Sequence, residues 1–198
     1  MFTLKLNVNP EGWRFFMRRK LDLRFTEFSK KILARDEFCC QFCGLEAREH
    51  HEIINLDHNY FNNKASNLVT ACVFCTQCVF LESVGVGGQG GGVLIYLPEI
   101  EQNYLNGLCH LLFKAMNNNT EYKESAQNAY RHLKLRSQII EAEWGENMQD
   151  PALFGQLLIE SGHKASLFEK ELFTSIRLLP SRAGVKSESG LNASSLIA

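Results

Sequence analysis

The order of apolar and polar residues predicts a short strand and a helix near the start of the chain. Residues 2–9 (FTLKLNVN) alternate apolar and polar side chains, which is typical of a half-buried strand. Apolar residues then recur at helical spacing, which predicts an amphipathic helix over about 22–35. Asp22 is a suitable N-cap because its carboxylate can accept hydrogen bonds from the first turn of that helix.

Helical spacing of apolar residues returns in the second half of the chain. Pro98 suits the first position of a helix, and Thr120 suits the cap after the polar break at 117–120. The small polar residues at 181–198 predict a disordered tail. The predicted helices run from Pro98 to that break and over about 121–144, 151–161 and 164–179, with stops at Gly145, Gly162 and Pro180.

A glycine-rich run separates the two halves. The spacing Gly85-x-Gly87-x-x-Gly90 formally matches the fingerprint of dinucleotide-binding folds. That fingerprint requires a helix after it, whereas VLIYLP (93–98) is strand-like and ends at a proline. No Gly-Lys-Ser/Thr follows either, which excludes a P-loop. We interpret this run as a flexible or tightly turning connector.

Length and charge add limits to this picture. The 198 residues suit one globular unit, or one unit with a small subdomain, and their formal charge of −1 favours neither nucleic acid nor membrane. The charge is uneven, because residues 1–35 hold nine Lys/Arg against three Asp/Glu. A basic cluster of this kind is usually a solvated face, although it could meet an acidic partner segment or anionic lipid.

The chain has no apolar run long enough for a transmembrane helix, and its first residues lack the apolar core of a signal peptide. We therefore expect a cytoplasmic protein in a reducing compartment. Seven cysteines are unexpected as disulfides there, and four of them are better explained by a metal.

Two cysteine pairs offer the four ligands of a metal site. Cys40-Gln-Phe-Cys43 is followed by Gly44, which permits a tight turn that faces both thiolates to one ion, and Cys72-Val-Phe-Cys75 supplies the second pair. These four cysteines predict one structural Zn²⁺. Because sulfur would fill all four positions, we expect the ion to stabilise the fold and not to activate water.

Other roles for the cysteines stay open at this point. The two pairs could be buried apolar residues or a redox pair. Cys78 follows Cys75 by three residues and could replace Cys72 or Cys75 as a ligand. Cys109 suits the apolar side of a helix.

The segments RDEFCCQFCG and LDHNYFNNKASNLVTACVFC, within about residues 28–80, resemble HNH (ββα-metal) endonucleases that carry two CxxC pairs. The resemblance implies an HNH- or treble-clef-like zinc head. It also implies a second site, with Asp57 as ligand of a divalent ion, His58 as general base and Asn67 as the residue that orients His58. The family's further His or Asn ligand falls on Thr76, which implies a degenerate nuclease site. His50 could also ligate or shuttle protons, but a loop histidine is more often solvated.

A longer resemblance covers about residues 5–162. LNVNPEGWRFFMRRK, CQFCG, NLVTACVFCTQC, VFLESVGVGGQGGGVLIYLPE, SAQNAYR and DPALFGQLLIESG together resemble the DotN (IcmJ) family of the Dot/Icm type IVB secretion coupling complex. This resemblance implies a structural subunit that docks on the C-terminal extension of the coupling ATPase DotL, beside DotM and the IcmS–IcmW adaptor. It implies a place at the cytoplasmic face of the bacterial inner membrane, reached through partners, in an apparatus that delivers effector proteins for virulence.

Together these features predict an α+β protein with an HNH-like ββα zinc head and a mainly helical body. Aromatic residues of the body are usually core, but could instead form a partner surface: Tyr96, Tyr104, Tyr122, Tyr130 and Trp144. The predicted parts are a basic N-terminal segment with the zinc head (1–83), a glycine-rich connector and strand (84–97), the body (98–180) and the tail (181–198).

Three functions compete. The first is a zinc-stabilised adaptor that is not an enzyme. The second is a divalent-metal nuclease that uses Asp57, His58 and Asn67. The third is a non-cleaving nucleic-acid binder that uses basic side chains, for which the acidic remainder of the chain gives the least support: Arg14, Arg18, Arg19 and Lys20.

Overall fold

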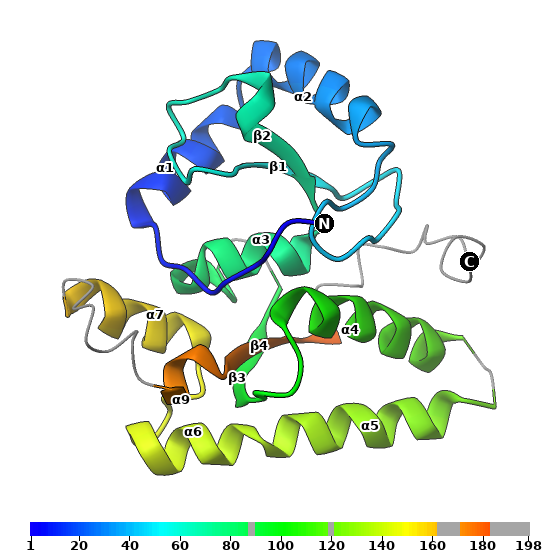
Figure 1. The fold of residues 1–198 in the computed structure, drawn as a ribbon, viewed down its shortest axis with the longest axis vertical. Coiled ribbons are helices and arrows are strands. Elements are labelled where there is room, and N and C mark those ends of the chain that lie inside the picture. The colour runs from blue at the N-terminus through cyan, green and yellow to red at the C-terminus, as the bar shows by residue number, and fades with distance from the viewer. Residues whose placement is uncertain (87–89, 119–120, 162–170, 183–198) are drawn as a thin grey trace.

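A computed structural model describes residues 1–86, 90–118, 121–161 and 171–182 (Figure 1). The N-terminal half, here called the head, contains α1 (Pro10–Arg19), α2 (Leu23–Arg35), β1 (Glu52–Asn55), η1 (Ala65–Asn67), β2 (Leu68–Ala71), α3 (Val73–Val79) and η2 (Leu81–Ser83). The C-terminal half, here called the body, contains β3 (Gly92–Tyr96), α4 (Gln102–Asn117), α5 (Lys123–Leu135), α6 (Ser137–Trp144), α7 (Pro151–Glu160), α9 (Glu171–Thr174) and β4 (Ile176–Pro180).

The helix predicted over 22–35 is confirmed as α2. Its N-cap is Asp22, whose carboxylate accepts the backbone N–H of Arg24 at 2.8 Å. The helix covers the antiparallel β1–β2 pair, because Ile32 packs with Ile53 and Leu68 in a small buried cluster. Local spacing and a local cap were sufficient to predict this element.

The strand predicted over residues 2–9 is wrong. Its backbone groups do not pair with another strand but bond to a loop and to the end of α3. The Phe2 N–H donates to the Gln41 carbonyl, and the Asn7 N–H donates to the Cys78 carbonyl. The alternation of apolar residues still reflects burial, since Leu4 and Val8 belong to the core.

Helix α1 was not predicted from the pattern, although its first residues carry the signals of a helix start. Pro10 occupies the first turn, and the side chain of Asn9 accepts the backbone N–H of Gly12 at 2.9 Å. Phe16 is fully buried in the core on the inner face of this helix.

In the body, β3 and β4 form a two-stranded antiparallel sheet in which Gly92 lies opposite Pro180 and Tyr96 opposite Ile176. Figure 1 shows α4 between α3 of the head and α5, with α5 and α6 along the side of the body far from the head. The predicted strand after the glycine run is confirmed as β3. Residues 87–89 of the run lie outside the described residues.

Among the described residues, the helix predicted over about 164–179 is confirmed at Glu171–Thr174, which is α9. It is wrong from Ile176 onward, because Ile176–Pro180 is the strand β4. Apolar residues in this stretch are buried against β3, and pairing with that distant strand decides their conformation. Residues 162–170 and 183–198 lie outside the described part of the chain, and so do the predicted stop at Gly162 and nearly all of the predicted tail.

The other predicted helices of the body need changes at their boundaries. Pro98 does not start α4, which begins at Gln102. The residues between them form a turn, in which the Ile100 carbonyl accepts a hydrogen bond from the Arg177 side chain. Glu99 of the same turn pairs with Arg136. The helix predicted over 121–144 divides at Arg136 into α5 and α6, and Gly145 ends α6 with a φ of +106°. The third predicted helix is confirmed as α7 with Asp150 as its N-cap. Thr120 lies outside the described residues.

One hydrophobic core joins the head and the body. It extends from Leu4 and Phe16 through α3 to Phe113 of α4 and Leu178 of β4. The chain is therefore α+β, and its described residues form helices around two small antiparallel sheets. No helix in the described part of the chain combines the length and the apolar character that crossing a membrane requires.

Candidate metal centre

Two turns that are distant in sequence supply the four cysteines. Cys40 and Cys43 lie in a loop after α2, where Cys40 N–H donates to the Leu45 carbonyl and Gly44 N–H to that of Cys40. Gly44 has a φ of +78°, a conformation that glycine adopts at little cost, so the loop can close tightly. The second pair lies at the N-terminus of α3, which has Cys72 as its N-cap residue.

The four sulfur atoms form a compact cluster. The Sγ atoms of Cys40, Cys43, Cys72 and Cys75 all lie within 4.8 Å of one another, and those of Cys43 and Cys72 are 3.6 Å apart. A tetrahedral ion with Zn–S distances of about 2.3 Å requires sulfur–sulfur separations of about 3.8 Å, so the arrangement fits such an ion. The cluster can therefore hold a metal ion, as the spacing of the two pairs predicted.

Four thiolates buried together would be unfavourable without a positive ion to balance their charge. Cys40, Cys72 and Cys75 are almost completely buried. Burial raises the pKa of Cys72 and that of Cys75 well above the usual value, which disfavours bare thiolates. A divalent ion that replaces the thiol protons would remove this penalty, since thiolates are the metal-binding form.

Helix α4 of the body completes the surroundings of the sulfur cluster. Asn106 is fully buried, and its Nδ2 lies 3.3 Å from the Cys75 Sγ and donates to it. The Nε2 atom of His110 lies 3.4 Å from the Cys72 Sγ. Both contacts reach the α3 cysteines from the other half of the molecule, so the candidate metal centre also links the head to the body.

The remaining cysteines lie outside the sulfur cluster. Cys78 is fully buried, donates to the Phe74 carbonyl at 3.2 Å, and has its pKa raised to about 12 by burial. It is not part of the only group of potential metal ligands found among the described residues, so the structure does not support it as a replacement ligand. Cys109 is buried in the core, as predicted.

The residues of the predicted nuclease half-site lie in the exposed loop between β1 and β2. The Asp57 carboxylate accepts hydrogen bonds from Asn67 Nδ2 at 2.8 Å, Asn62 Nδ2 at 2.6 Å and the Asn59 backbone at 2.9 Å. Although desolvation acts in the opposite direction, these hydrogen bonds lower the pKa of Asp57. Asn67 also accepts the backbone N–H of Asp57 at 3.1 Å, so the two side chains hold each other.

His58 and Thr76 occupy different surroundings. His58 has a φ of +57°, and its carbonyl accepts a hydrogen bond from Asn9 Nδ2 at 2.9 Å. Partial desolvation lowers the pKa of its imidazole, opposed by the charge of Asp57. Thr76 is fully buried in α3 and its hydroxyl donates to the Cys72 carbonyl at 3.0 Å. A buried hydroxyl that is already bonded to its own helix is unsuited to ligate an ion in the solvent-exposed loop of Asp57.

Comparison with known proteins decides the family. No family model matches the chain. A curated protein of Legionella pneumophila named "Type 4 apparatus protein DotN" is 56% identical over 185 residues, which cover 93% of this chain and 86% of that protein. The chain belongs to the DotN family.

Two residues of this DotN-family chain that contact the candidate metal centre were missed from the sequence. Asn106 and His110 follow Gln102 at intervals of four, so three polar residues share the buried side of α4 with Leu105 and Cys109. Polar residues on an otherwise apolar helix face require partners when buried, and this signal was available. Apolar spacing alone predicts a face of this helix that includes Leu105, which is fully buried, and three residues that are only partly buried: Leu108, Leu112 and Ala115.

Proposed function

We propose that this chain is a zinc-stabilised structural adaptor subunit of a type IVB secretion coupling complex. The observation that carries the proposal is the 56% identity, over 93% of the chain, to a protein named for the type 4 apparatus. Such identity over nearly the whole length supports a shared role as a component of that apparatus.

In this proposal Cys40, Cys43, Cys72 and Cys75 hold one zinc ion in an HNH-like head formed by the β1–β2 pair and α3. Four sulfur ligands leave no position for water, so a bound zinc would act as a crosslink between the loop after α2 and the start of α3. The buried cluster within 4.8 Å supports this assignment. The contacts from Asn106 and His110 then fix the head against the body, which presents both halves to a partner as one rigid unit.

We propose that the partner is the C-terminal extension of the coupling ATPase DotL, with DotM and the IcmS–IcmW adaptor in the same assembly. The chain would then act at the cytoplasmic face of the inner membrane through these partners and support effector recruitment. Exposed aromatic side chains are compatible with a docking surface on the body, since Tyr104 and Tyr122 are exposed whereas Tyr130 packs on the core.

The rival proposal is a divalent-metal nuclease that uses Asp57, His58 and Asn67. Two observations oppose it. The Asp57 carboxylate is engaged by three hydrogen bonds from its own loop. Thr76, at the position of a further ligand, is buried and bonded to Cys72. A divalent ion would therefore have one engaged carboxylate and few other protein ligands.

A single preparation can separate the two proposals. The full chain is purified, its zinc content is measured, and capture of the DotL C-terminal extension is compared for wild type and His58→Ala. We expect one zinc per chain, equal capture by both proteins, and no cleavage of plasmid or single-stranded DNA with Mg²⁺ or Mn²⁺. Cleavage that His58→Ala abolishes would support the nuclease, and a folded, zinc-loaded chain that fails to capture the extension would refute the adaptor.

A further inference from the structure

The basic cluster of the first 35 residues separates into engaged and free side chains in the structure. Lys20 pairs with Glu52, Lys30 with Glu27 and Arg35 with Asp36. Three exposed arginines of this cluster form no ion pair among the described residues: Arg14, Arg18 and Arg24.

Arg19 is also engaged, as a buried support of the same region. Its Nη1 donates to Asn55 Oδ1 at 2.6 Å and to Asn63 Oδ1 at 3.3 Å, and its guanidinium lies 4.4 Å from the centre of the Phe25 ring. Burial lowers its pKa to about 10. Through these contacts Arg19 joins the C-terminal end of α1, the start of α2 and the loop after β1 into one end of the head.

Three of the four most exposed large apolar side chains among the described residues lie at this end, and the fourth is Met1. Leu21 and Leu23, in and after the turn between α1 and α2, are 85% and 81% exposed, and Phe61 is 70% exposed. The Phe61 ring lies 4.1 Å, centre to centre, from that of Phe15 on α1, which places the loop against the helix. Large apolar groups are seldom left this exposed in water without a function when several lie together.

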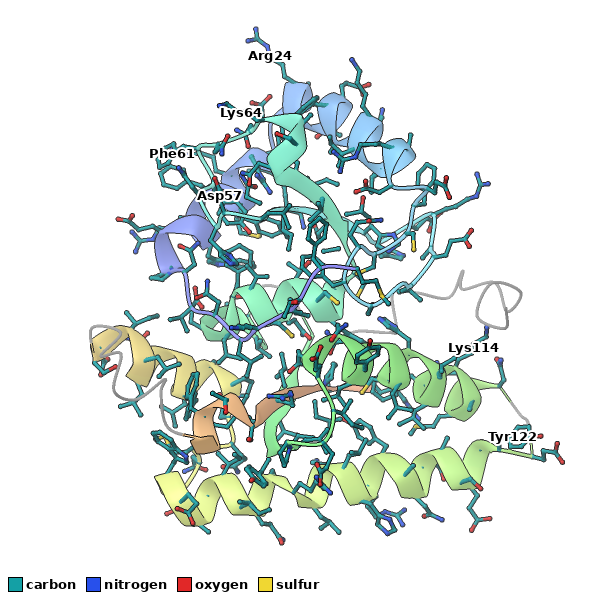
Figure 2. All side chains as sticks on the ribbon, viewed as in Figure 1. Arg24, Asp57, Phe61, Lys64, Lys114 and Tyr122 are labelled. Carbon is teal, nitrogen blue, oxygen red and sulfur yellow. The ribbon has the colours of Figure 1, made fainter. Side chains whose placement is uncertain are left out.

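Cations surround these apolar groups. Arg14 and Arg18 are four residues apart on one face of α1, Arg24 follows Leu23 directly, and Lys64 lies in the same loop as Phe61. Figure 2 shows Arg24, Lys64 and Phe61 at the end of the head that points away from the body. We call this set the basic tip: Arg14, Arg18, Leu21, Leu23, Arg24, Phe61 and Lys64.

We propose that the basic tip binds directly to a bilayer that contains anionic lipid. Interfacial membrane binding combines apolar side chains, which enter the headgroup boundary, with Lys and Arg, which remain at the anionic surface. The basic tip has both groups on one exposed end. An acidic protein segment would pair with the cations but would leave Leu21, Leu23 and Phe61 in water, so the lipid surface is the better match.

Carboxylates also lie in the region. Glu11 is exposed one turn before Arg14 on α1, and Glu27 is exposed one turn after Arg24 on α2, where it pairs with Lys30. Asp22 and Asp57 have hydrogen-bond partners in the protein. Asp22 caps α2 through a hydrogen bond to Arg24 N–H, and Asp57 accepts hydrogen bonds from its own loop. These carboxylates reduce the positive charge of the basic tip, so binding should depend on several cations together and should weaken as salt is raised.

Co-sedimentation of the full chain with vesicles tests this proposal. We expect binding to phosphatidylcholine vesicles with about 30% phosphatidylserine at about 0.15 M salt, and little binding to phosphatidylcholine alone. Arg18→Gln/Arg24→Gln should weaken the partition about thirtyfold, because each cation near such a surface contributes about fivefold. Leu21→Ser/Leu23→Ser should weaken it about tenfold or more.

Matched controls on α5 of the body distinguish a specific surface from general stickiness. Lys123→Gln/Lys134→Gln removes two exposed cations, and Leu135→Ser alters an exposed leucine, at the opposite end of the molecule (Figure 1). These controls should bind as wild type. The proposal would be overturned if the head and body variants lost vesicle binding equally, or if the wild type did not sediment with the phosphatidylserine vesicles. Capture of a glutamate-rich peptide in the absence of vesicle binding would also overturn it and assign the basic tip to an acidic protein.

Discussion

Replacing Asn106 by leucine tests whether α4 of the body supports the candidate metal centre. Asn106 Nδ2 donates to the Cys75 Sγ at 3.3 Å, and its Oδ1 accepts from Gln102 Nε2 at 2.9 Å. Leucine has nearly the same shape but removes the N–H···S contact. The Gln102 amide keeps the Leu178 carbonyl at 2.8 Å as the acceptor of one N–H, while its other N–H loses the Asn106 oxygen.

The expected magnitude follows from the charge on the sulfur. A hydrogen bond to a charged group contributes about 1.5–3 kcal/mol, and the loss of a residue that supports a metal ligand lowers metal affinity about 10- to 100-fold. The two ranges agree, since 10- to 100-fold corresponds to about 1.4–2.7 kcal/mol. We therefore expect Asn106→Leu to weaken zinc binding by that factor while the protein remains folded when zinc is saturating.

Competition for zinc with a chromophoric chelator measures this ratio. Asn103→Leu is the matched control, because Asn103 is buried on the same helix, whereas the described α4 contacts to the cysteine cluster come from Asn106 and His110. It should bind zinc as wild type does. If Asn106→Leu binds zinc within about threefold of the control, the thiolate contact contributes nothing measurable and the reasoning is refuted.

Three further predictions concern the head, the body and pH. Cys40→Ser should abolish stoichiometric zinc binding and cooperative unfolding, because a neutral hydroxyl cannot replace a thiolate; a zinc-loaded variant would contradict this. Gly155→Ala should destabilise the chain by about 1–3 kcal/mol in urea unfolding, since a Cβ would lie 2.8 Å from the Glu82 nitrogen. Gly107→Ala, with its nearest neighbour at 3.5 Å, should be neutral or stabilising. An NMR titration should give His58 a pKa below 6.5 in the folded chain, and a value at or above 6.5 would contradict the structure. Because His58 then protonates more readily in the unfolded chain, the folded state should lose stability as the pH falls below 6.5.

Elements set by local signals were predictable from the sequence. Helix α2 follows from apolar spacing and from Asp22, and α7 from the Asp150-Pro151 start. The four-cysteine cluster was also predictable. Each pair has a fixed local spacing, and a tetrahedral zinc site needs four ligands, which the two pairs together supply.

Features set by distant contacts were not predictable. Ile176–Pro180 becomes a strand because β3 pairs with it, and no local pattern distinguishes it from an apolar helix segment. At the split of α5 and α6, Arg136 contacts residues far away in sequence, because its carbonyl accepts the Tyr96 N–H and its side chain pairs with Glu99. Similarly, the mutual hydrogen bonds of Asp57 and Asn67 become visible only when the loop between β1 and β2 is folded.

X-ray absorption at the zinc edge of the purified full chain tests whether the four cysteines hold a closed structural zinc site. We expect one zinc per chain with four sulfur neighbours at about 2.3 Å, the geometry of a closed structural site. An oxygen neighbour from an exchangeable water, or a sulfur count of three or fewer, would show an open site and would contradict the assignment of this ion to a structural role.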